Sequence, residues 1–302
     1  MTYKIPPRLR KGNIVAVVAT ARAIDPDTVN AGIELLRGWG LQVITGKSLY
    51  QSHHLFAGTD RQRLEDLQLA LDNQEVKAIF CARGGYGTTR LLDSINWEGF
   101  RRSPKWICGF SDVTSLLSHV HTLGYACLHS SMPQLLVGEN AQSDSDSLRR
   151  ALFDQEVNLT ANPYPENQYG SAEGVITGGN LSLMVHLTGT NSDVDTDGKI
   201  LLLEEVDEYL YHIDRMMVQL ARTGKLRNIR GLIVGHLTRM KEGDLKFGTG
   251  AMGIIKSHMG RKSIPIGFGF PFGHASPNLA VPLGIKCNLQ VTENGSILVS
   301  KY

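Results

Sequence analysis

Trp106-Ile107-Cys108-Gly109-Phe110-Ser111-Asp112-Val113-Thr114 is the stretch of the chain that decides the fold. An apolar run at residues 106–110 predicts a buried strand, and a helix is expected over about 112–123, directly after Ser111. A strand that passes straight into a helix is the repeating unit of open α/β sheets. The same turn is typical of a nucleophile elbow, which exposes a serine hydroxyl beside free helix amides. A serine that only caps the helix is the alternative interpretation.

The alternation of strand and helix continues on both sides of this stretch. Apolar patterning predicts further strands at 14–19, 41–45 and 76–81, and helices at 26–38, 61–71 and 88–95. Asp25 and Asp60 are the expected N-caps of the first two helices. This rhythm indicates a parallel sheet with right-handed crossovers.

The second half of the chain has a different pattern. Residues 138–168 are polar and proline-containing, with a helix expected only near 148–153. Beyond them we expect a helix after Asn180, strands at 200–203, 232–235 and 264–268, an amphipathic helix around 213–220, and a hairpin of 286–291 with 296–299.

The prediction is therefore an α/β protein with an N-terminal open, mostly parallel sheet flanked by helices and a C-terminal mixed α/β lobe. The domain boundaries that we expect are 1–140 for the N-terminal domain, 141–168 for the connection and 169–302 for the C-terminal domain. The active site would lie between the two lobes.

Composition excludes several classes of protein. The 302 residues carry 31 basic and 29 acidic side chains, a net charge of +2, which gives no electrostatic reason to expect a nucleic-acid partner. The aliphatic run 14–19 is too short for a membrane span or a signal-peptide core, so we expect a cytoplasmic protein without a membrane partner. The four cysteines form no paired or zinc-binding spacing, which predicts reduced thiols and no metal.

Glycine is over-represented, with 32 residues, and part of that excess lies in the segment Cys81-Ala82-Arg83-Gly84-Gly85-Tyr86-Gly87. This segment follows a predicted parallel strand, at the edge of the sheet where α/β proteins bind ligands. Its backbone amides could form an oxyanion hole or an anion-binding nest, and a flexible turn is the alternative. The segment contains neither a dinucleotide-binding nor a Walker pattern.

A serine nucleophile needs a base and an acid that orients it. Among the ten histidines, His274 stands out because it lies in a turn-rich segment just past a predicted strand. The acid is expected where the aliphatic strand 200–203 runs into Glu204 and Glu205. Because side chains alternate along a strand, these two carboxylates should point to opposite faces, and the pattern alone does not choose between them.

Together these segments resemble the LD-carboxypeptidase family of serine peptidases over nearly the whole chain. The segments that carry the resemblance are the early strand Ile14-Val15-Ala16-Val17-Val18-Ala19, Phe56-Ala57-Gly58-Thr59-Asp60-Arg61-Gln62-Arg63-Leu64-Glu65-Asp66-Leu67, Ala82-Arg83-Gly84-Gly85-Tyr86-Gly87, Gly109-Phe110-Ser111-Asp112, Gly178-Gly179-Asn180-Leu181, Leu203-Glu204-Glu205, Ile213-Asp214-Arg215-Met216, Phe272-Gly273-His274 and Val281-Pro282-Leu283-Gly284.

The resemblance implies a catalytic triad of Ser111 as nucleophile, Glu204 as acid and His274 as base. It further implies an oxyanion hole made by the backbone amides of Gly85 and Asp112. The implied reaction releases D-alanine from the murein tetrapeptide, a small peptide substrate, in cell-wall recycling. No cofactor or metal is implied, and a homodimer is expected.

Residues that bind the substrate are expected beside this triad. Arg83 is a candidate for the terminal carboxylate, with a structural ion pair as the alternative, and Gly84 and Ser131 are further candidates. Met132 stands where relatives have glycine. Two other functions remain open at this point. One is that of the microcin C immunity peptidases, a related branch that cleaves aminoacyl-nucleotides, and the other is that of a non-catalytic peptide-binding protein.

Overall fold

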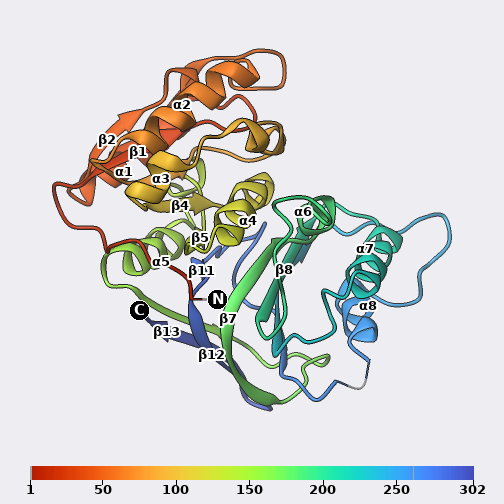
Figure 1. Ribbon diagram of the computed structural model, residues 1–302. Coiled ribbons are helices and arrows are strands. Elements are labelled where there is room, and N and C mark those ends of the chain that lie inside the picture. Colours follow the sequence, from red (N-terminus) through yellow and green to blue (C-terminus); the bar gives the residue numbers. More distant parts are fainter. Residues whose placement is uncertain (1, 261) are drawn as a thin grey trace.

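The computed structural model describes residues 2–260 and 262–302 and contains two sheets (Figure 1). The first sheet has six strands in the order β11-β5-β4-β3-β1-β2. Their bounds are β1 Ile14–Val18, β2 Gln42–Thr45, β3 Val76–Cys81, β4 Trp106–Gly109, β5 Cys127–His129 and β11 Val281–Leu283. All neighbours are parallel except β11, which pairs antiparallel with β5. The predicted N-terminal, mostly parallel sheet is thus confirmed.

Helices connect the parallel strands of this sheet. Their bounds are α1 Pro26–Gly38, α2 Asp60–Asp72, α3 Glu98–Arg102 and α4 Thr114–Thr122. Asp25 caps α1 by accepting from the Thr28 amide, as the sequence predicts. The prediction of Asp60 as the N-cap of α2 was wrong by one residue. Thr59 is the N-cap and forms a reciprocal capping box with Gln62, so Asp60 lies inside the first turn.

The second sheet has seven strands in the order β10-β9-β8-β7-β12-β13-β6. Their bounds are β6 Glu156–Ala161, β7 Gly170–Asn180, β8 Ile200–Val206, β9 Gly231–Thr238, β10 Ile266–Phe268, β12 Lys286–Thr292 and β13 Gly295–Lys301. Strands β7 to β10 are parallel, whereas β12, β13 and β6 are antiparallel, so this sheet is mixed, and β12 with β13 forms the predicted hairpin. The helices of this part are α6 Leu181–His186, α7 Leu210–Arg222 and α8 Ala251–His258 (Figure 1).

Two segments differ from the sequence prediction. Residues 88–95 form two short 3-10 turns, Thr88–Arg90 and Leu92–Ser94, in place of one helix. In the stretch 141–168 a helix is expected only near 148–153, whereas the structure has the longer helix α5, Gln142–Phe153, followed by strand β6, which pairs with β13. The polar start of α5 is ordered because its side chains are buried against the C-terminal half, where Ser147 Oγ accepts from the Ala280 amide at 3.0 Å.

The central parallel strands of both sheets bury aliphatic side chains on their two faces, which explains their continuous apolar runs. Strands β6, β12 and β13 alternate between buried and more exposed residues and so bury one face. All four cysteines are buried free thiols. Across the described ranges, no helix has the length and apolar character needed to cross a membrane. The important consequence for function is that strands β3, β4, β8 and β9 direct their carboxyl ends toward one shared region between the sheets.

Candidate active site

Ser111 lies at the turn between β4 and α4, where the chain leaves the first sheet. Its φ of 62° is in the left-handed region, which a residue with a side chain rarely adopts. Such a conformation costs about 1–3 kcal/mol and persists only where the surroundings impose it. The strained turn exposes the hydroxyl at the carboxyl edge of the sheet, the layout that the sequence predicts for an elbow.

A chain of two hydrogen bonds joins Ser111 to a histidine and a buried carboxylate. Ser111 Oγ lies 2.9 Å from His274 Nε2, and His274 Nδ1 lies 2.6 Å from Glu204 Oε2. Glu204 is fully buried within β8. Because an ionised carboxylate can only accept, Nδ1 carries the proton and Nε2 is left to accept from the serine hydroxyl. The structure therefore brings together all three side chains predicted as the triad.

The loop after β10 fixes the imidazole of His274 in this position. Gly273 has a φ of 109°, and a Cβ there would lie 2.8 Å from Glu204 Oε2, so only glycine allows this close approach. The Gly273 amide donates to Asn278 Oδ1 at 2.8 Å. On the other side, the ring of Phe110 packs against that of His274 with 4.8 Å between centroids. These contacts hold the imidazole of His274 in its place beside Ser111.

Glu204 and Glu205 point to opposite faces of β8, as alternation predicts. The Glu205 carboxylate accepts from Asn180 Nδ2 at 2.9 Å and from the Ser182 amide at 2.7 Å, at the start of α6. Burial raises the pKa of Glu205. Glu204 is thus the carboxylate that contacts the histidine, and Glu205 ties α6 to β8.

Gly84 lies directly against Ser111. A Cβ built on Gly84 would be 3.2 Å from Ser111 Cβ and 3.5 Å from the Asp112 amide nitrogen. As one of the first amides of a helical segment, Asp112 N–H has no intrahelical acceptor. The Asp112 side chain accepts from the Thr88 amide at 2.9 Å and so ties the elbow to the segment after Gly87. The space between Gly84 and the Asp112 amide has the location that an oxyanion hole requires.

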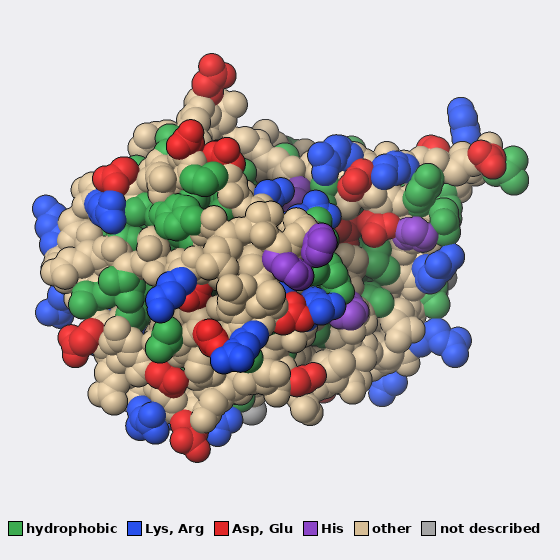
Figure 2. Space-filling model, turned by 90° about the horizontal axis from the view of Figure 1, so that it is seen from above, with side chains coloured by type: hydrophobic (Ala, Val, Ile, Leu, Met, Phe, Trp, Pro, Cys, Tyr) green, Lys and Arg blue, Asp and Glu red, His purple; other side chains and the backbone are tan. Residues whose placement is uncertain are grey.

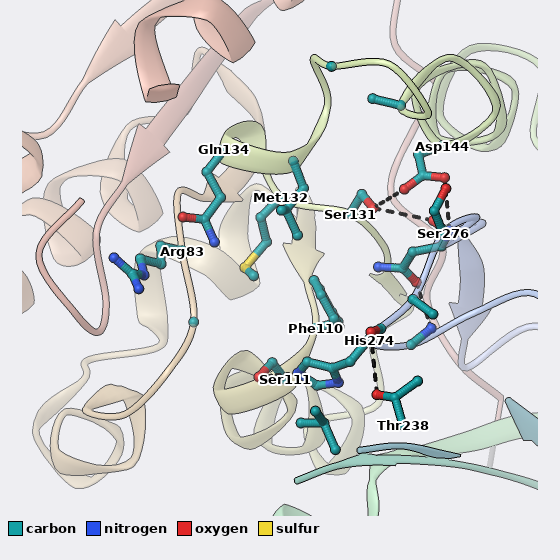
Figure 3. A pocket seen from close by; sticks show the side chains of 18 of the residues that line it. Arg83, Phe110, Ser111, Ser131, Met132, Gln134, Asp144, Thr238, His274 and Ser276 are labelled. Carbon is teal, nitrogen blue, oxygen red and sulfur yellow. Dashed lines mark hydrogen bonds between the residues drawn. The ribbon is translucent and has the colours of Figure 1, made fainter. Parts of the chain in front are cut away.

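A cavity of about 830 Å³ opens over Ser111 and His274 (Figure 3). Arg83 and Ser131 line it as predicted, but each already has a protein partner. Arg83 Nη1 donates to the Ala23 carbonyl at 2.7 Å, and Ser131 Oγ donates to Asp144 Oδ2 at 2.7 Å. In Figure 3 Arg83 lies on the opposite side of the cavity from Thr238.

Sequence reasoning missed the part of the cavity formed by the ends of β8 and β9. Asp207, Thr238 and Arg239 line the cavity there. The predicted strands ended three residues early at 203 and 235, so these residues were not placed at a carboxyl strand end. The rule that ligands bind at such ends could have found them if the strand lengths had been known.

The lining of the cavity carries both signs of charge, since it includes Arg22, Arg239, Glu139 and Asp207. Figure 2 shows acidic and basic side chains interspersed on one face of the molecule, with histidines gathered near its middle. Among residues 2–260 and 262–302, no cluster of histidine, cysteine and acidic side chains suits a metal ion.

Serine hydrolases are the class of enzyme in which a serine hydroxyl is activated by a histidine that a carboxylate orients. Comparison with known families gives a narrower assignment. The LD-carboxypeptidase N-terminal domain matches residues 15–130, and the LD-carboxypeptidase C-terminal domain matches residues 173–289. The chain belongs to the LD-carboxypeptidase family and is a serine peptidase.

Relatives share this organisation over most of their length. The chain is 34% identical to a probable murein peptide carboxypeptidase of Bacillus subtilis, over 99% of this chain and 95% of the relative. It is 30% identical to the murein tetrapeptide carboxypeptidase of Pseudomonas aeruginosa, over 89% and 91%. The crystal structure of the muramoyltetrapeptide carboxypeptidase from Oxalobacter formigenes superposes with a TM-score of 0.87 at 26% identity, covering 96% of this chain and 99% of that one.

A second branch of solved structures shares the fold. The microcin C7 self immunity protein, in complex with aspartyl sulfamoyl adenosine, superposes with a TM-score of 0.86 over 100% of this chain and 99% of that one. Its identity of 18% establishes likeness of fold alone.

Proposed function

We propose that this serine peptidase removes the terminal D-alanine from the murein tetrapeptide through an acyl-enzyme on Ser111. The observation that carries the proposal is the hydrogen-bond chain from Ser111 through His274 to the buried Glu204, at the floor of a peptide-sized cavity. The similarity to proteins named murein peptide and murein tetrapeptide carboxypeptidases supports this choice of substrate.

The reaction begins when Ser111 Oγ attacks the carbonyl carbon of the L-configured centre and its proton passes to His274 Nε2. Glu204 stabilises the imidazolium and keeps the proton on Nδ1. The oxyanion accepts from the amides of Asp112 and Gly85, each worth about 3 kcal/mol of transition-state stabilisation. The tetrahedral adduct then collapses, His274 returns the proton to the amine nitrogen, and the D-amino acid leaves.

Water completes the cycle. His274 takes a proton from the water, the resulting hydroxide attacks the acyl ester, and the proton returns to Ser111 Oγ as the shortened peptide is released. The acyl group and the free amine account for all atoms of the substrate, and the net reactant is one water molecule.

The decisive experiment offers L-Ala-D-Glu-diaminopimelate-D-Ala and an aminoacyl sulfamoyl adenylate side by side and follows both by mass spectrometry. Release of D-alanine from the tetrapeptide, lost in Ser111→Ala, is the expected result. Cleavage of the adenylate alone would move the enzyme to the aminoacyl-nucleotide branch. Binding of the tetrapeptide without cleavage would indicate a non-catalytic binding protein.

Three predictions from sequence accompany this proposal. They are a cytoplasmic location, a homodimer, and domain boundaries at 1–140, 141–168 and 169–302. Light scattering after size exclusion tests the dimer, because a 33.2 kDa chain doubles its mass on dimerisation. Limited proteolysis tests the boundaries, since cleavage concentrates in exposed connections.

A further inference from the structure

Three arginines, Arg22, Arg83 and Arg239, line the catalytic cavity, and they differ in position. Arg83 donates to a backbone carbonyl and lies on the side away from Thr238 (Figure 3). Arg22 packs along the glycine segment, because a Cβ on Gly85 would be 2.6 Å from Arg22 Cδ. Arg239 directly follows Thr238, the last residue of β9, and Figure 3 shows Thr238 on the other side of the cavity from Arg83. The two sides of the reacting centre therefore carry different cations.

The position of the general acid determines on which side of the scissile bond the leaving group lies. His274 Nε2 must deliver its proton to the departing amine, so the leaving amino acid lies on the His274 side of the scissile bond. In an α-amino acid the carboxylate carbon is about 2.5 Å from that amine nitrogen. Thr238 Oγ1 donates to the His274 carbonyl at 3.4 Å, which places the next residue, Arg239, on this same side.

Left-handed backbone conformations of non-glycine residues cluster on this same side of the cavity, at the ends of β8 and β9. Val206 and Thr238 are paired where β8 and β9 end, and the residue after each is left-handed, with φ of 67° at Asp207 and 53° at Arg239. Together with Ser111, these make three of the five left-handed non-glycine residues within the described ranges, and all three line the cavity. Such conformations cluster at ligand sites, where the fold imposes them to aim a side chain.

Within the described residues the Arg239 guanidinium makes no close ion pair, although Lys241, together with the charge of Arg239, lowers the pKa of the neighbouring Asp207 carboxylate. Asp207 Oδ1 is paired with Lys241 Nζ at 2.9 Å. In the described part of the chain no carboxylate lies within 4.0 Å of the Arg239 guanidinium. An unpaired, exposed guanidinium can bind a carboxylate through two parallel hydrogen bonds.

We propose that Arg239 binds the terminal carboxylate of the departing D-amino acid and so makes the site a carboxypeptidase. This inference rests on the proposed function, because it requires an L,D-peptide in the cavity. It assigns the terminal carboxylate to Arg239 and not to Arg83.

The test compares two substrates, the tetrapeptide with a free terminal carboxylate and the same peptide ending in D-alaninamide. The wild-type enzyme should prefer the free acid in kcat/KM by about ten- to a hundredfold, the range of a charge-assisted hydrogen bond. Arg239→Gln should lose this preference by slowing only the free acid. Arg22→Gln, which removes a cation from the opposite wall, is the matched control and should keep the wild-type preference.

Arg239→Gly separates charge from backbone, because glycine adopts the left-handed conformation freely. A role in binding predicts that Arg239→Gly behaves like Arg239→Gln, whereas a purely structural role predicts wild-type preference in Arg239→Gly. Arg239→Lys should restore part of the preference. An active wild-type enzyme whose preference survives in Arg239→Gln, or disappears only in Arg83→Gln, would overturn the assignment. A wild-type enzyme that releases no D-alanine would instead refute the proposed function.

Discussion

Replacing Gly84 by alanine separates the chemistry of the site from the stability of the fold. The new methyl carbon would lie 3.4 Å from Ser111 Oγ and 3.5 Å from the Asp112 amide nitrogen. A reactive substrate carbonyl needs its carbon about 3–3.5 Å from Oγ and its oxygen about 2.7–3.1 Å from the donors. The methyl group and the carbonyl cannot occupy this space together.

The expected loss in kcat/KM for Gly84→Ala is at least about 10²- to 10³-fold, the cost of losing one oxyanion donor. Stability should change little, because Gly84 is outside the left-handed region and its shortest new contact is 3.2 Å, to Ser111 Cβ. We expect a change within about 1 kcal/mol, with a tight contact offset by the lower entropy of the unfolded alanine chain.

The assay measures D-alanine release together with thermal unfolding of the same preparations. Gly38→Ala is the matched control, since a Cβ at Gly38 meets no atom within 4 Å and both activity and fold should survive. A folded Gly84→Ala enzyme with activity within about threefold of wild type would show that the carbonyl binds elsewhere, and the proposed oxyanion hole would have to be abandoned.

Three further changes test other parts of the site. Glu204→Gln should keep the fold but lower kcat by about 10³- to 10⁴-fold, because an amide can donate to His274 Nδ1 and so favour the wrong tautomer; a near-normal kcat would rule out the orienting role. Glu205→Ala should instead lower the free energy of unfolding by about 2–4 kcal/mol, measured in urea, with activity per folded molecule retained; the reverse pattern would exchange the roles of the two acids. Burial lowers the pKa of His129 to about 4, so unfolding takes up a proton and stability falls as pH drops from about 6.5 to 4. In His129→Phe this dependence should weaken, and an unchanged slope in urea titrations would contradict the assignment.

The fold was predictable where apolar patterning and local capping agree. The strand 76–81 was found from sequence because it is an almost continuous buried apolar run, and the helix capped by Asp25 was found because its buried residues recur at helical spacing. Strand β11 was missed because its three residues pair with β5 from a distant part of the chain, and no local pattern records such a partner.

Helix α5 shows a second physical limit. Its first half is polar, which predicts exposure, yet Asp144, Ser145 and Ser147 are buried. Asp144 accepts from both Ser131 Oγ and the Asn278 amide, and Ser147 Oγ accepts from the Ala280 amide, so these two side chains are satisfied by tertiary partners. Ser145 Oγ donates to the Gln142 carbonyl of its own helix. The local sequence shows that these side chains are polar and therefore costly to bury without a hydrogen bond. It does not show which distant residue supplies that hydrogen bond.

The two carboxylates of β8 show how far sequence physics reaches in the site itself. Alternation requires Glu204 and Glu205 to face opposite ways, but which face meets His274 depends on how the loop after β10 folds back over the sheet. The loop can come this close to β8 because residue 273 is glycine, since a side chain there would collide with Glu204. Which of the two carboxylates contacts His274 therefore depends on a residue 69 positions away, 273 − 204, and becomes visible only when both segments are placed in space.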